Sequence, residues 1–450
     1  MDTNFHPNIH SNIHPFWVDI IKTGDISIIK QFVNSDVNNN NIHDNHFMTP
    51  LHYAIIFIRD MEIIDLLINS VANVNIQDTN GLTALHYIMI IEHINQQHII
   101  DLLIKAGANV NIQTIHNVYE YCLDATPLHL AIQYKCDIKV IESLINAGAD
   151  INIKNRHGHT SLQYAIINEC NLQIIELLIK SGANVNNQDN HGTSALYDAI
   201  FNGDEKLIEI LIKAGADINI QDNNGNSPLH YAINQRRCHF NIIFEILINS
   251  GANINLQNSH GETPLHTAVS PIFSTGFTED SDIEIIQLLL KNDANINIKN
   301  KYGASPLHYA IKHVCTIEII ELLIQSGANL NIQNNDGDTP LYNTVKFNYF
   351  TGLPIHNYIK KFQLLLKMGA IINIKNKKGY TILHLAKQNR LNNLVQLLID
   401  YSTKQLISAC IGFRQYKIGA NAILEICQNI CIDFSKKEII DIMNKSYLIK

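Results

Sequence analysis

The chain has 450 residues, with 33 lysines and arginines against 41 aspartates and glutamates, which gives a formal net charge of −8 at pH 7. Its few arginines are dispersed apart from Arg236 and Arg237. It therefore lacks the basic stripe of nucleic-acid-binding proteins, and we expect no nucleic-acid partner. No apolar run reaches the roughly 18 to 20 residues of a membrane span, and residues 1–14 hold no apolar signal-peptide core, so we expect no membrane association. Eight cysteines without a Cys-x-x-Cys pair favour a reducing, intracellular location.

The first apolar region covers residues 16–33, where two apolar stretches flank the turn residues Gly24 and Asp25. This pattern predicts a short helix pair. Terminal units of repeat arrays are atypical because their outer face meets water. We therefore interpret residues 1–48 as a tail followed by a degenerate capping unit.

From residue 49 onward, a block close to Thr-Pro-Leu-His recurs ten times, at intervals of 33 to 43 residues. A period near 33 with this opening is typical of an array in which each unit is one β-turn and two short helices. Such a unit is too small to bury its own apolar face and folds only by stacking on its neighbours. The blocks begin at Thr49, Thr83, Thr126, Thr160, Ser194, Ser227, Thr263, Ser305, Thr339 and Thr381.

The fourth unit shows how the sequence specifies the two helices. Thr160 is suited to be the N-cap of the first helix, and a proline follows this position in most sister units, where a missing N–H costs nothing. Residues 162–166 supply its buried stripe. Residues 172–179 predict a second helix that is apolar around most of its circumference and hence buried between neighbours. Gly182 ends that helix in the left-handed conformation, and residues 184–192 make the connecting turn.

These residues resemble the ankyrin-repeat family, over roughly residues 49–400, through the Thr-Pro-Leu-His-x-Ala blocks and the Gly-Ala-Asn-x-Asn returns. The resemblance implies an all-α fold, an ankyrin-repeat solenoid of stacked helix-turn-helix units joined by β-hairpin-like turns, with about ten repeats forming one continuous domain. Weaker helix ends are expected where the C-cap glycine is replaced. The departures from the pattern are Val71 and Asp293 for that glycine, Gln163, Tyr197 and Tyr342 for the motif histidine, and Ile382 for the proline.

After Tyr401 the motif no longer occurs. Residues 418–430 and 436–444 look like a further helix pair, and we interpret residues 401–450 as a C-terminal helical cap, with a separate interaction module as the alternative. Cys427 and Cys431 within it would share a helix face and are interpreted as core residues.

The 22 histidines suggest a metal or catalytic site at first sight. The resemblance instead implies that each motif histidine hydrogen-bonds the turn of its own or the next unit. His6, His10 and His14 have the spacing of ligands on one helix face, but Pro7 and Pro15 disfavour a helix there. There is no nucleophile with a paired base, no phosphate-binding glycine loop and no carboxylate pair in a plausible cleft. We therefore predict no enzyme, no metal and no cofactor.

Three cysteines, Cys136, Cys170 and Cys315, share one position of the repeat. Packed helices lie about 8 to 10 Å apart, which exceeds the usual Cα separation of a disulfide, roughly 4.4 to 6.8 Å. We expect these cysteines to remain thiols.

In the ankyrin family the partner usually meets the concave face, formed by the hairpin tips and the outer positions of the first helices. Carried over to this chain, those positions lie seven and eight residues after each motif Thr or Ser; they are apolar in the first half of the array and polar in the second. Exposed apolar and aromatic side chains are frequent in interaction sites. The alternative is that these side chains only pack against neighbouring helices. The predicted partner-binding residues are Ile56, Phe57, Ile90, Ile91, Tyr134, Ile167 and Phe201.

Three intervals are longer than the rest. The 43-residue interval carries seven extra residues within residues 114–125, and there we add Tyr119 and Tyr121 to the candidate binding residues. The two 42-residue intervals each carry eight extra residues between the helices, around residues 271–281 and 347–358, and are expected to form surface loops. Neutral drift is the alternative for each, and we favour it for residues 271–281.

Two functions remain. The first is a non-enzymatic, monomeric scaffold that binds a protein partner whose identity the sequence does not give. The second is a substrate adaptor for a ubiquitin ligase, as in many poxvirus ankyrin proteins, although residues 401–450 contain no proline and so lack the Leu-Pro-x-Glu start of the expected F-box-like module. The heavy use of Asn, Ile and Lys, with asparagine runs such as residues 38–41, resembles the ankyrin proteins of giant DNA viruses of amoebae, of the mimivirus kind. That resemblance implies action in the host cytoplasm.

Overall fold

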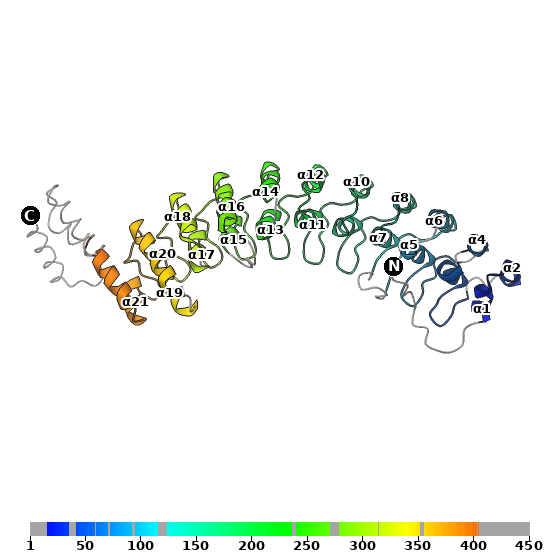
Figure 1. Cartoon of the computed structure of the whole chain (residues 1–450), viewed down its shortest axis with the longest axis horizontal. Helices are drawn as coiled ribbons and strands as arrows, with labels where there is room; N and C mark the ends of the chain where they lie inside the picture. Colours follow the sequence, from blue (N-terminus) through cyan, green and yellow to red (C-terminus); the bar gives the residue numbers. More distant parts are fainter. Residues whose placement is uncertain are drawn as a thin grey trace, which may run out of the picture. The chain divides into compact units, whose positions relative to one another are not determined.

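Every named element of the chain in this computed structural model is a helix, and turns join them (Figure 1). The all-α repeat fold predicted from the sequence is confirmed for the described part of the chain. Two compact units divide the chain, residues 1–223 and residues 224–450. The structure describes residues 16–35, 42–58, 60–70, 73–91, 95–115, 124–235, 240–270, 279–313, 315–351, 355–402 and 404.

In the first unit, the helices form two layers, as the two rows of Figure 1 show. First helices contact first helices, in the order α5, α7, α9 and α11, and second helices contact second helices, in the order α4, α6, α8 and α10. The elements are α1 (Phe16–Thr23), α2 (Ile26–Ser35), α3 (Pro50–Tyr53), the π-helix η2 (Ala54–Ile58), α4 (Met61–Asn69), α5 (Ala84–Ile90), α6 (Gln96–Lys105), α7 (Pro127–Gln133), α8 (Ile138–Asn146), α9 (Ser161–Ile167), α10 (Leu172–Lys180), α11 (Ala195–Asn202) and α12 (Glu205–Lys213).

At the start of this unit, α1 and α2 form a helix pair that packs on the first repeat. The turn between them uses Gly24 at a positive φ of 67°. Helix α1 contacts α3, and α2 contacts α4. The ring of Trp17, which is fully buried, meets the edge of Tyr53 with the ring centres 5.3 Å apart.

The second unit repeats the arrangement, with contacts between α13 and α15, α15 and α17, and α17 and α19 along the layer of first helices. Residues 392–402 are also helical. The elements are α13 (Pro228–Gln235), α14 (Phe240–Asn249), α15 (Pro264–Ala268), α16 (Glu279–Lys291), α17 (Pro306–Lys312), α18 (Ile317–Gln325), α19 (Pro340–Thr351), α20 (Ile355–Lys367) and α21 (Ile382–Gln388).

The prediction of a surface loop over residues 347–358 is wrong for the described residues. Helix α19 has 12 residues and α20 has 13, whereas α17 and α18 have 7 and 9. The extra residues therefore lengthen both helices by about one turn each. Of the other long interval, residues 279–281 belong to α16, which also has 13 residues, and residues 271–278 lie outside the described part.

Each first helix begins with the motif Thr or Ser as its N-cap. In α7 the Thr126 hydroxyl accepts from the His129 N–H at 3.4 Å, and the Thr126 N–H donates to His129 Nδ1 at 3.3 Å. Two backbone donors at the helix start are thereby satisfied within four residues. Pro127 at N1 removes a third donor that would have no partner there. The motif thus specifies the helix start locally.

The other ring nitrogen of the motif histidine joins neighbouring repeats. Because Nδ1 accepts a hydrogen bond, Nε2 carries the proton. His86 Nε2 donates to the Ile112 carbonyl at 3.1 Å, and His129 Nε2 donates to the His159 carbonyl at 3.2 Å. In the second unit His266 and His308 make the same bond. The implied role of these histidines, in both their own and the next turn, is confirmed.

Two replacements of the motif histidine keep this bond between repeats. Gln163 accepts from the Thr160 N–H at 3.3 Å and donates to the Thr193 carbonyl at 3.0 Å. The Tyr197 hydroxyl donates to the Ile220 carbonyl at 2.7 Å. Histidine, glutamine and tyrosine at the motif-histidine position each supply a donor that reaches the turn of the next repeat.

The Gly-Ala-Asn-x-Asn segment after each second helix also joins neighbouring repeats. Its last asparagine contacts the same segment of the next repeat. In the second repeat, Asn111 Nδ2 donates to the Gly148 carbonyl at 3.0 Å, and Asn111 Oδ1 accepts from the Asp150 N–H at 2.7 Å. One side-chain amide thus pairs a carbonyl and an N–H that follow the end of a helix. The same paired contact is made by Asn75, Asn152, Asn186, Asn255 and Asn297.

Glycine at the hairpin tip allows neighbouring hairpins to stack. Gly192 has a positive φ of 79°, and a Cβ placed on it would lie 2.5 Å from the Asn223 backbone nitrogen. That nitrogen donates to the His191 carbonyl at 3.0 Å, so the backbones meet directly. In the first hairpin Phe47 takes the equivalent place with φ 61°. Asp293, which replaces a C-cap glycine, adopts φ 63°, and Val71 lies outside the described residues.

Cys136, Cys170 and Cys315 are free thiols, as expected. The Cys136 thiol donates to the Met89 carbonyl of the preceding repeat at 3.5 Å. Cys427 and Cys431 lie outside the described residues.

Candidate interaction surface

Four large apolar side chains are exposed at the C-terminal ends of the first helices of the first unit. The exposed fractions are 42% for Phe57, 36% for Tyr134, 43% for Ile167 and 45% for Phe201. Helices α7, α9 and α11 lie side by side, and α5 lies between α7 and the helix of Phe57, so the ends of these helices form one surface, which we call the first-helix face. Four of the seven residues predicted for this surface are therefore exposed on it.

Two other predicted residues are buried. Ile56 is 7% exposed and Ile91 is 6% exposed, so neither lies on the first-helix face, and their assignment to the surface is wrong. Ile56 turns inward because the first helix of its repeat ends in the π-helix η2, which changes the phase of the last turn. Ile91 is the C-cap of α5 and has an extended backbone. Ile90 is half-buried.

The two tyrosines proposed from the long hairpin, Tyr119 and Tyr121, lie outside the described residues. So do the three N-terminal histidines, His6, His10 and His14. Within the described ranges, no group of three or more His, Cys, Asp and Glu side chains is arranged to hold a metal ion. No helix in those ranges is both long and apolar enough to cross a membrane.

Beneath the first-helix face lies a layer of tyrosine–carboxylate hydrogen bonds. In each of the first two repeats, the residue after the motif histidine is a tyrosine. The Tyr53 hydroxyl donates to Asp44 at 3.0 Å, and the Tyr87 hydroxyl donates to Asp78 at 2.7 Å. Both aspartates are buried and also accept from backbone N–H groups of their own hairpin. The hairpin is in this way fixed to the first helix.

In the fifth repeat Asp198 replaces that tyrosine. It is placed close to Asp189, the hairpin aspartate, and to His159 of the preceding hairpin. Burial and the negative charge of Asp189 raise the pKa of Asp198 to about 7, against the opposing effect of His159 and Gln163. One carboxylate oxygen of Asp198, Oδ2, has no hydrogen-bond partner among the described residues.

Asp189 in the same cluster is the ionised member. Its Oδ2 lies 3.5 Å from His159 Nε2, and its Oδ1 accepts from the N–H groups of His191 and Thr193. Burial alone would raise the pKa of Asp189, but these hydrogen bonds lower it to about 2. Sequence reasoning missed the cluster. Its one signal was an acidic residue, Asp198, at a position that is tyrosine in several other repeats.

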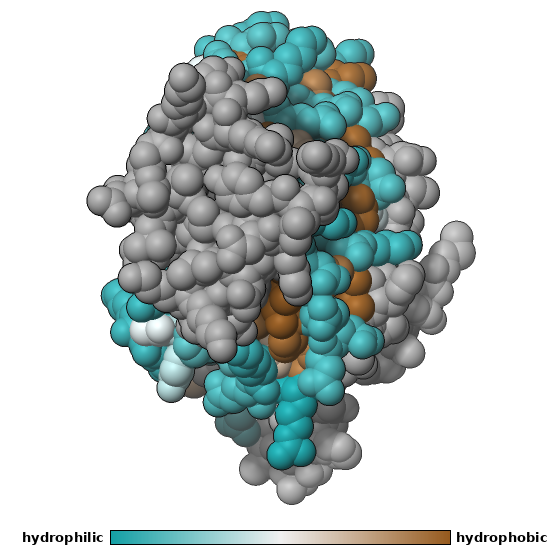
Figure 2. Space-filling view, turned by 90° about the vertical axis from the view of Figure 1, so that its left-hand side faces the viewer, coloured by the Kyte–Doolittle hydropathy of each residue, from teal (hydrophilic) through white to brown (hydrophobic). Residues whose placement is uncertain are grey.

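In the second unit, the equivalent ends of the first helices are polar, as expected. Lys312 at the end of α17 is exposed and His313 is half-buried. Exposed aromatic side chains lie on the hairpins instead, with 61% of Tyr302 and 44% of Tyr380 exposed. Figure 2 views the molecule from the left-hand side of Figure 1 and shows hydrophobic residues as a narrow, broken band between hydrophilic ones.

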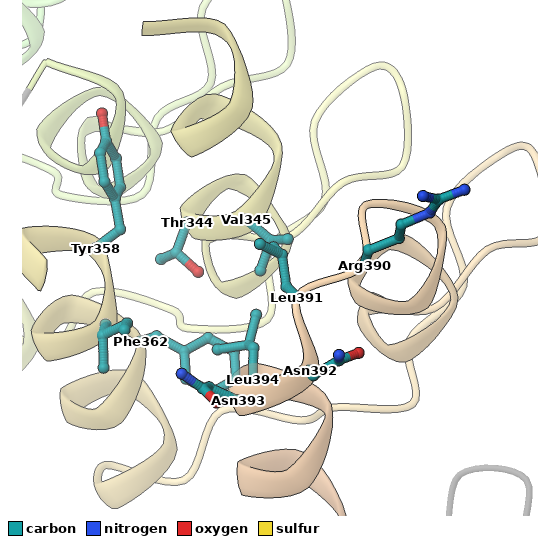
Figure 3. Close-up of a pocket in the computed structure, with 10 residues that line it drawn as sticks. Thr344, Val345, Tyr358, Phe362, Arg390, Leu391, Asn392, Asn393 and Leu394 are labelled. Atoms are coloured by element: carbon teal, nitrogen blue, oxygen red, sulfur yellow. The ribbon is translucent and has the colours of Figure 1, made fainter. Parts of the chain in front are cut away.

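A cavity of about 280 Å³ lies between α19, α20 and the start of the helix at residues 392–402. Figure 3 shows Thr344 and Val345 of α19 facing Phe362 of α20, whereas the Arg390 side chain points away from them. Its walls are mostly apolar. Among its described lining residues there is no acid–base pair, so the cavity offers no catalytic constellation. The remaining lining residues are Tyr358, Ile359, Leu391, Asn392, Asn393 and Leu394.

The repeated helix pair, the capping histidine and the stacked hairpins together define a helical repeat protein. The sequence pattern of the family described as "Ankyrin repeats (3 copies)" matches the chain in overlapping stretches that cover most of it, and the chain belongs to the ankyrin-repeat family. Ankyrin repeats generally mediate protein–protein interaction, and proteins built from them are typically non-enzymatic scaffolds. The matched stretches are residues 18–114, 56–155, 128–222, 196–271 and 277–355.

The chain is also similar to the crystal structure of the ankyrin repeat domain of Bcl-3, described as a unique member of the IkappaB protein family. The two share 25% sequence identity with a TM-score of 0.44, over 54% of this chain and 98% of that one. No curated protein sequence gives a significant match.

Proposed function

We propose that this protein is a non-enzymatic scaffold that binds a partner protein on the first-helix face of its first unit. The observation that carries the proposal is the exposure of Phe57, Ile167 and Phe201, between 42% and 45% each, at the same helix end in the first, fourth and fifth repeats. Leaving large apolar side chains in water is unfavourable by roughly 25 cal/mol per Å², and clustered examples mark interaction sites. Aromatic residues are also the commonest binding hot spots.

The alternative, in which these side chains only pack against neighbouring helices, fits Ile56 and Ile91 but not the exposed residues. Phe57 does contact Tyr53, with ring centres 5.4 Å apart, and it is still 42% exposed. The contact holds its ring in place on the surface. A side chain held in this way loses little entropy when a partner covers it.

The test is an affinity capture with the triple variant Phe57→Glu, Tyr134→Glu, Phe201→Glu, after circular dichroism has shown the wild-type helix content. We expect a specific partner of the wild type to be lost. The control is the double variant Tyr302→Glu, Tyr380→Glu, which places two glutamates, against three in the triple variant, on exposed aromatic positions of the second unit and should retain the partner. If the triple variant still captured the partner, the partner would not bind on the first-helix face.

We further propose that the protein acts as a monomer in the cytoplasm of a host cell. The asparagine-rich composition and its resemblance to the ankyrin proteins of giant DNA viruses support this placement. The ubiquitin-ligase adaptor remains the second candidate, and residues 405–450, where a recruiting module would lie, are outside the described part. Ligase subunits among the captured proteins would favour it.

A further inference from the structure

The two units of the chain differ sharply in charge. Residues 1–223 contain 11 lysines and arginines against 25 aspartates and glutamates, a formal net charge of −14. Residues 224–450 contain 22 against 16, a net charge of +6. The value of −8 for the whole chain hides this difference. A partner of the first unit therefore approaches a strongly negative surface, whose field favours a positive ligand.

Negative charge is also placed beside each exposed apolar residue of the first-helix face. In four repeats an acidic residue follows the apolar one by two or three positions, at the turn into the second helix. Asp60, Asp137 and Glu169 are exposed and Asp204 is half-buried. The pairs are Phe57 with Asp60, Tyr134 with Asp137, Ile167 with Glu169, and Phe201 with Asp204.

Three of these acids are held in fixed positions as helix N-caps. Asp60 Oδ1 accepts from the Glu62 N–H at 2.9 Å, and Asp137 Oδ1 accepts from the Lys139 N–H at 2.9 Å. Asp204 Oδ1 accepts from the Leu207 N–H at 3.0 Å. The charges in the first, third and fifth repeats are therefore ordered in advance. Ordered groups bind at a lower entropic cost than mobile ones.

Two cations stand in these four turns, Arg59 and Lys135, against four acids, so the turns carry a negative charge between them. Lys135 is exposed. Asp198 lies one helical turn before Phe201 on α11 and has a carboxylate oxygen without a described partner. Asp189 beside it is ionised, and its Oδ2 lies 3.5 Å from His159 Nε2. The fifth repeat thus adds the negative charge of Asp189 to those of the turns.

We infer that the partner presents a basic amphipathic helix, with lysine or arginine interleaved with apolar side chains, to the first-helix face of the first unit. This inference rests on the proposed function. Neighbouring first helices pack about 8 to 10 Å apart. Two turns of a helix crossing them advance about 10.5 Å. An apolar residue and a basic residue every seven positions would therefore meet one apolar–acidic pair in each of the consecutive third, fourth and fifth repeats.

The experiment measures binding of a fluorescent peptide of about 20 residues, with leucine and lysine placed every seven positions on one helix face. The first variant is Asp137→Asn, Glu169→Gln, Asp204→Asn, in which asparagine still caps both helices. The matched control is Glu142→Gln, Glu176→Gln, Glu209→Gln, which removes the same charge from the second helices of the same unit. We expect the first variant to weaken binding about tenfold at about 50 mM salt, and the control less than about twofold. A peptide with glutamate in place of lysine should not bind.

Equal weakening of peptide binding by both charge variants would overturn the inference, because it would assign the effect to overall charge. No binding of the basic peptide would also overturn it, because the partner would then need another chemistry. The proposed function is judged separately, by the loss of the captured partner in the Phe57, Tyr134 and Phe201 triple variant. If the partner is lost in that triple variant but retained by the Asp137→Asn, Glu169→Gln, Asp204→Asn variant, the scaffold function is supported and the basic helix is rejected. If the partner is lost in both of these variants and retained by the Glu142→Gln, Glu176→Gln, Glu209→Gln control, the scaffold function and the basic helix are both supported.

Discussion

His86 and His129 are buried at the joints between neighbouring repeats, where burial lowers the pKa of each imidazole to about 4. The pKa of histidine in the unfolded chain is about 6.5. Between these two values the unfolded state binds more protons than the folded state, so stability falls as the pH falls. The contribution is complete above about pH 6.5, and near pH 5 each histidine has lost roughly 2 kcal/mol of it.

The variant His129→Gln tests this account, because Gln163 occupies the same place in the fourth repeat and makes both hydrogen bonds. We expect nearly unchanged stability near pH 7. Between about pH 7 and pH 5, the loss of unfolding free energy should be smaller than in the wild type by roughly 2 kcal/mol, measured by urea denaturation. A wild-type slope in His129→Gln would contradict the mechanism.

Phe47 is strained at the tip of the first hairpin. Its φ is 61°, at a position that is glycine in most other hairpins, and its ring is 49% exposed and stacked on His43 with the ring centres 4.4 Å apart. An L-residue in this conformation costs roughly 1–2 kcal/mol. We expect Phe47→Gly to raise the unfolding free energy by about 1 kcal/mol after loss of the stacking contact. Phe47→Ala keeps the Cβ, and an equal gain from it in urea denaturation would exclude strain as the cause.

At the residue scale, the sequence predicts roles that depend on neighbours within a few positions. Thr126 and His129 are three residues apart and satisfy each other within one helical turn. The burial of Ile91 follows from an extended backbone at a helix end, which the motif does not encode. The cluster around Asp198 needs residues from two hairpins and one helix, so it exists only after stacking.

At the element scale, neighbouring hairpins approach each other so closely that a side chain larger than glycine at the tip has no room. Gly192 and Gly379 have nearly equal φ values, 79° and 78°, but among the described residues only a Cβ on Gly192 would lie within 4 Å of a neighbouring hairpin. A difference in the stability cost of the same substitution at Gly192 and at Gly379 therefore measures the close approach of the next hairpin and not the backbone conformation.

We expect Gly379→Ala to lower the unfolding free energy by about 1–2 kcal/mol, the cost of a left-handed alanine. Gly192→Ala should cost roughly 1–3 kcal/mol more, because its Cβ would meet the Asn223 backbone nitrogen. The two variants are compared by urea denaturation under one condition. Equal losses would mean that the stacked hairpins shift apart at little cost.

Each helix pair is well predicted from sequence because the N-cap and the C-cap glycine stand at both ends of a short apolar pattern. The two long intervals are harder, since a longer helix and a longer loop add the same number of residues. In α19 and α20 the added residues continue the helices. Residues 347–351 contain no glycine or proline, and the Gly352 and Pro354 that follow fit the end of a longer helix as well as a loop.

At the scale of the whole molecule, the two units differ in charge more than in architecture. The motif spacing gives no sign of their boundary, because residues 223 and 224 lie inside a hairpin and the interval there is an ordinary 33 residues. The charge difference could have been found from the sequence by counting each half separately. The exposure of the apolar residues on the first-helix face could not be found from the sequence, because it depends on which side of each helix the neighbouring helices cover.

Self-repulsion in the first unit predicts a salt effect on local stability. With a net charge of −14 against +6, the first unit should gain more from screening, because salt shortens the range of repulsion from about 30 Å at 0.01 M to about 10 Å at 0.1 M. We expect amide hydrogen exchange, normalised to the unfolded chain, to slow more in α8 and α10 than in α14 and α18 as salt is raised over that range. Equal slowing in both units would show that the charge is already locally compensated.

The lengthened pair α19 and α20 borders the cavity. Helix α20 is four residues longer than α18, close to the 3.6 residues of one turn, and α19 is five residues longer than α17. An insertion of four residues nearly restores the angular position of every later side chain, so the buried stripe of α20 continues on the same side. A helix pair can therefore grow past its neighbours by about one turn without turning its apolar side chains into water, and Val345 and Tyr358, which line the cavity, belong to such a lengthened pair.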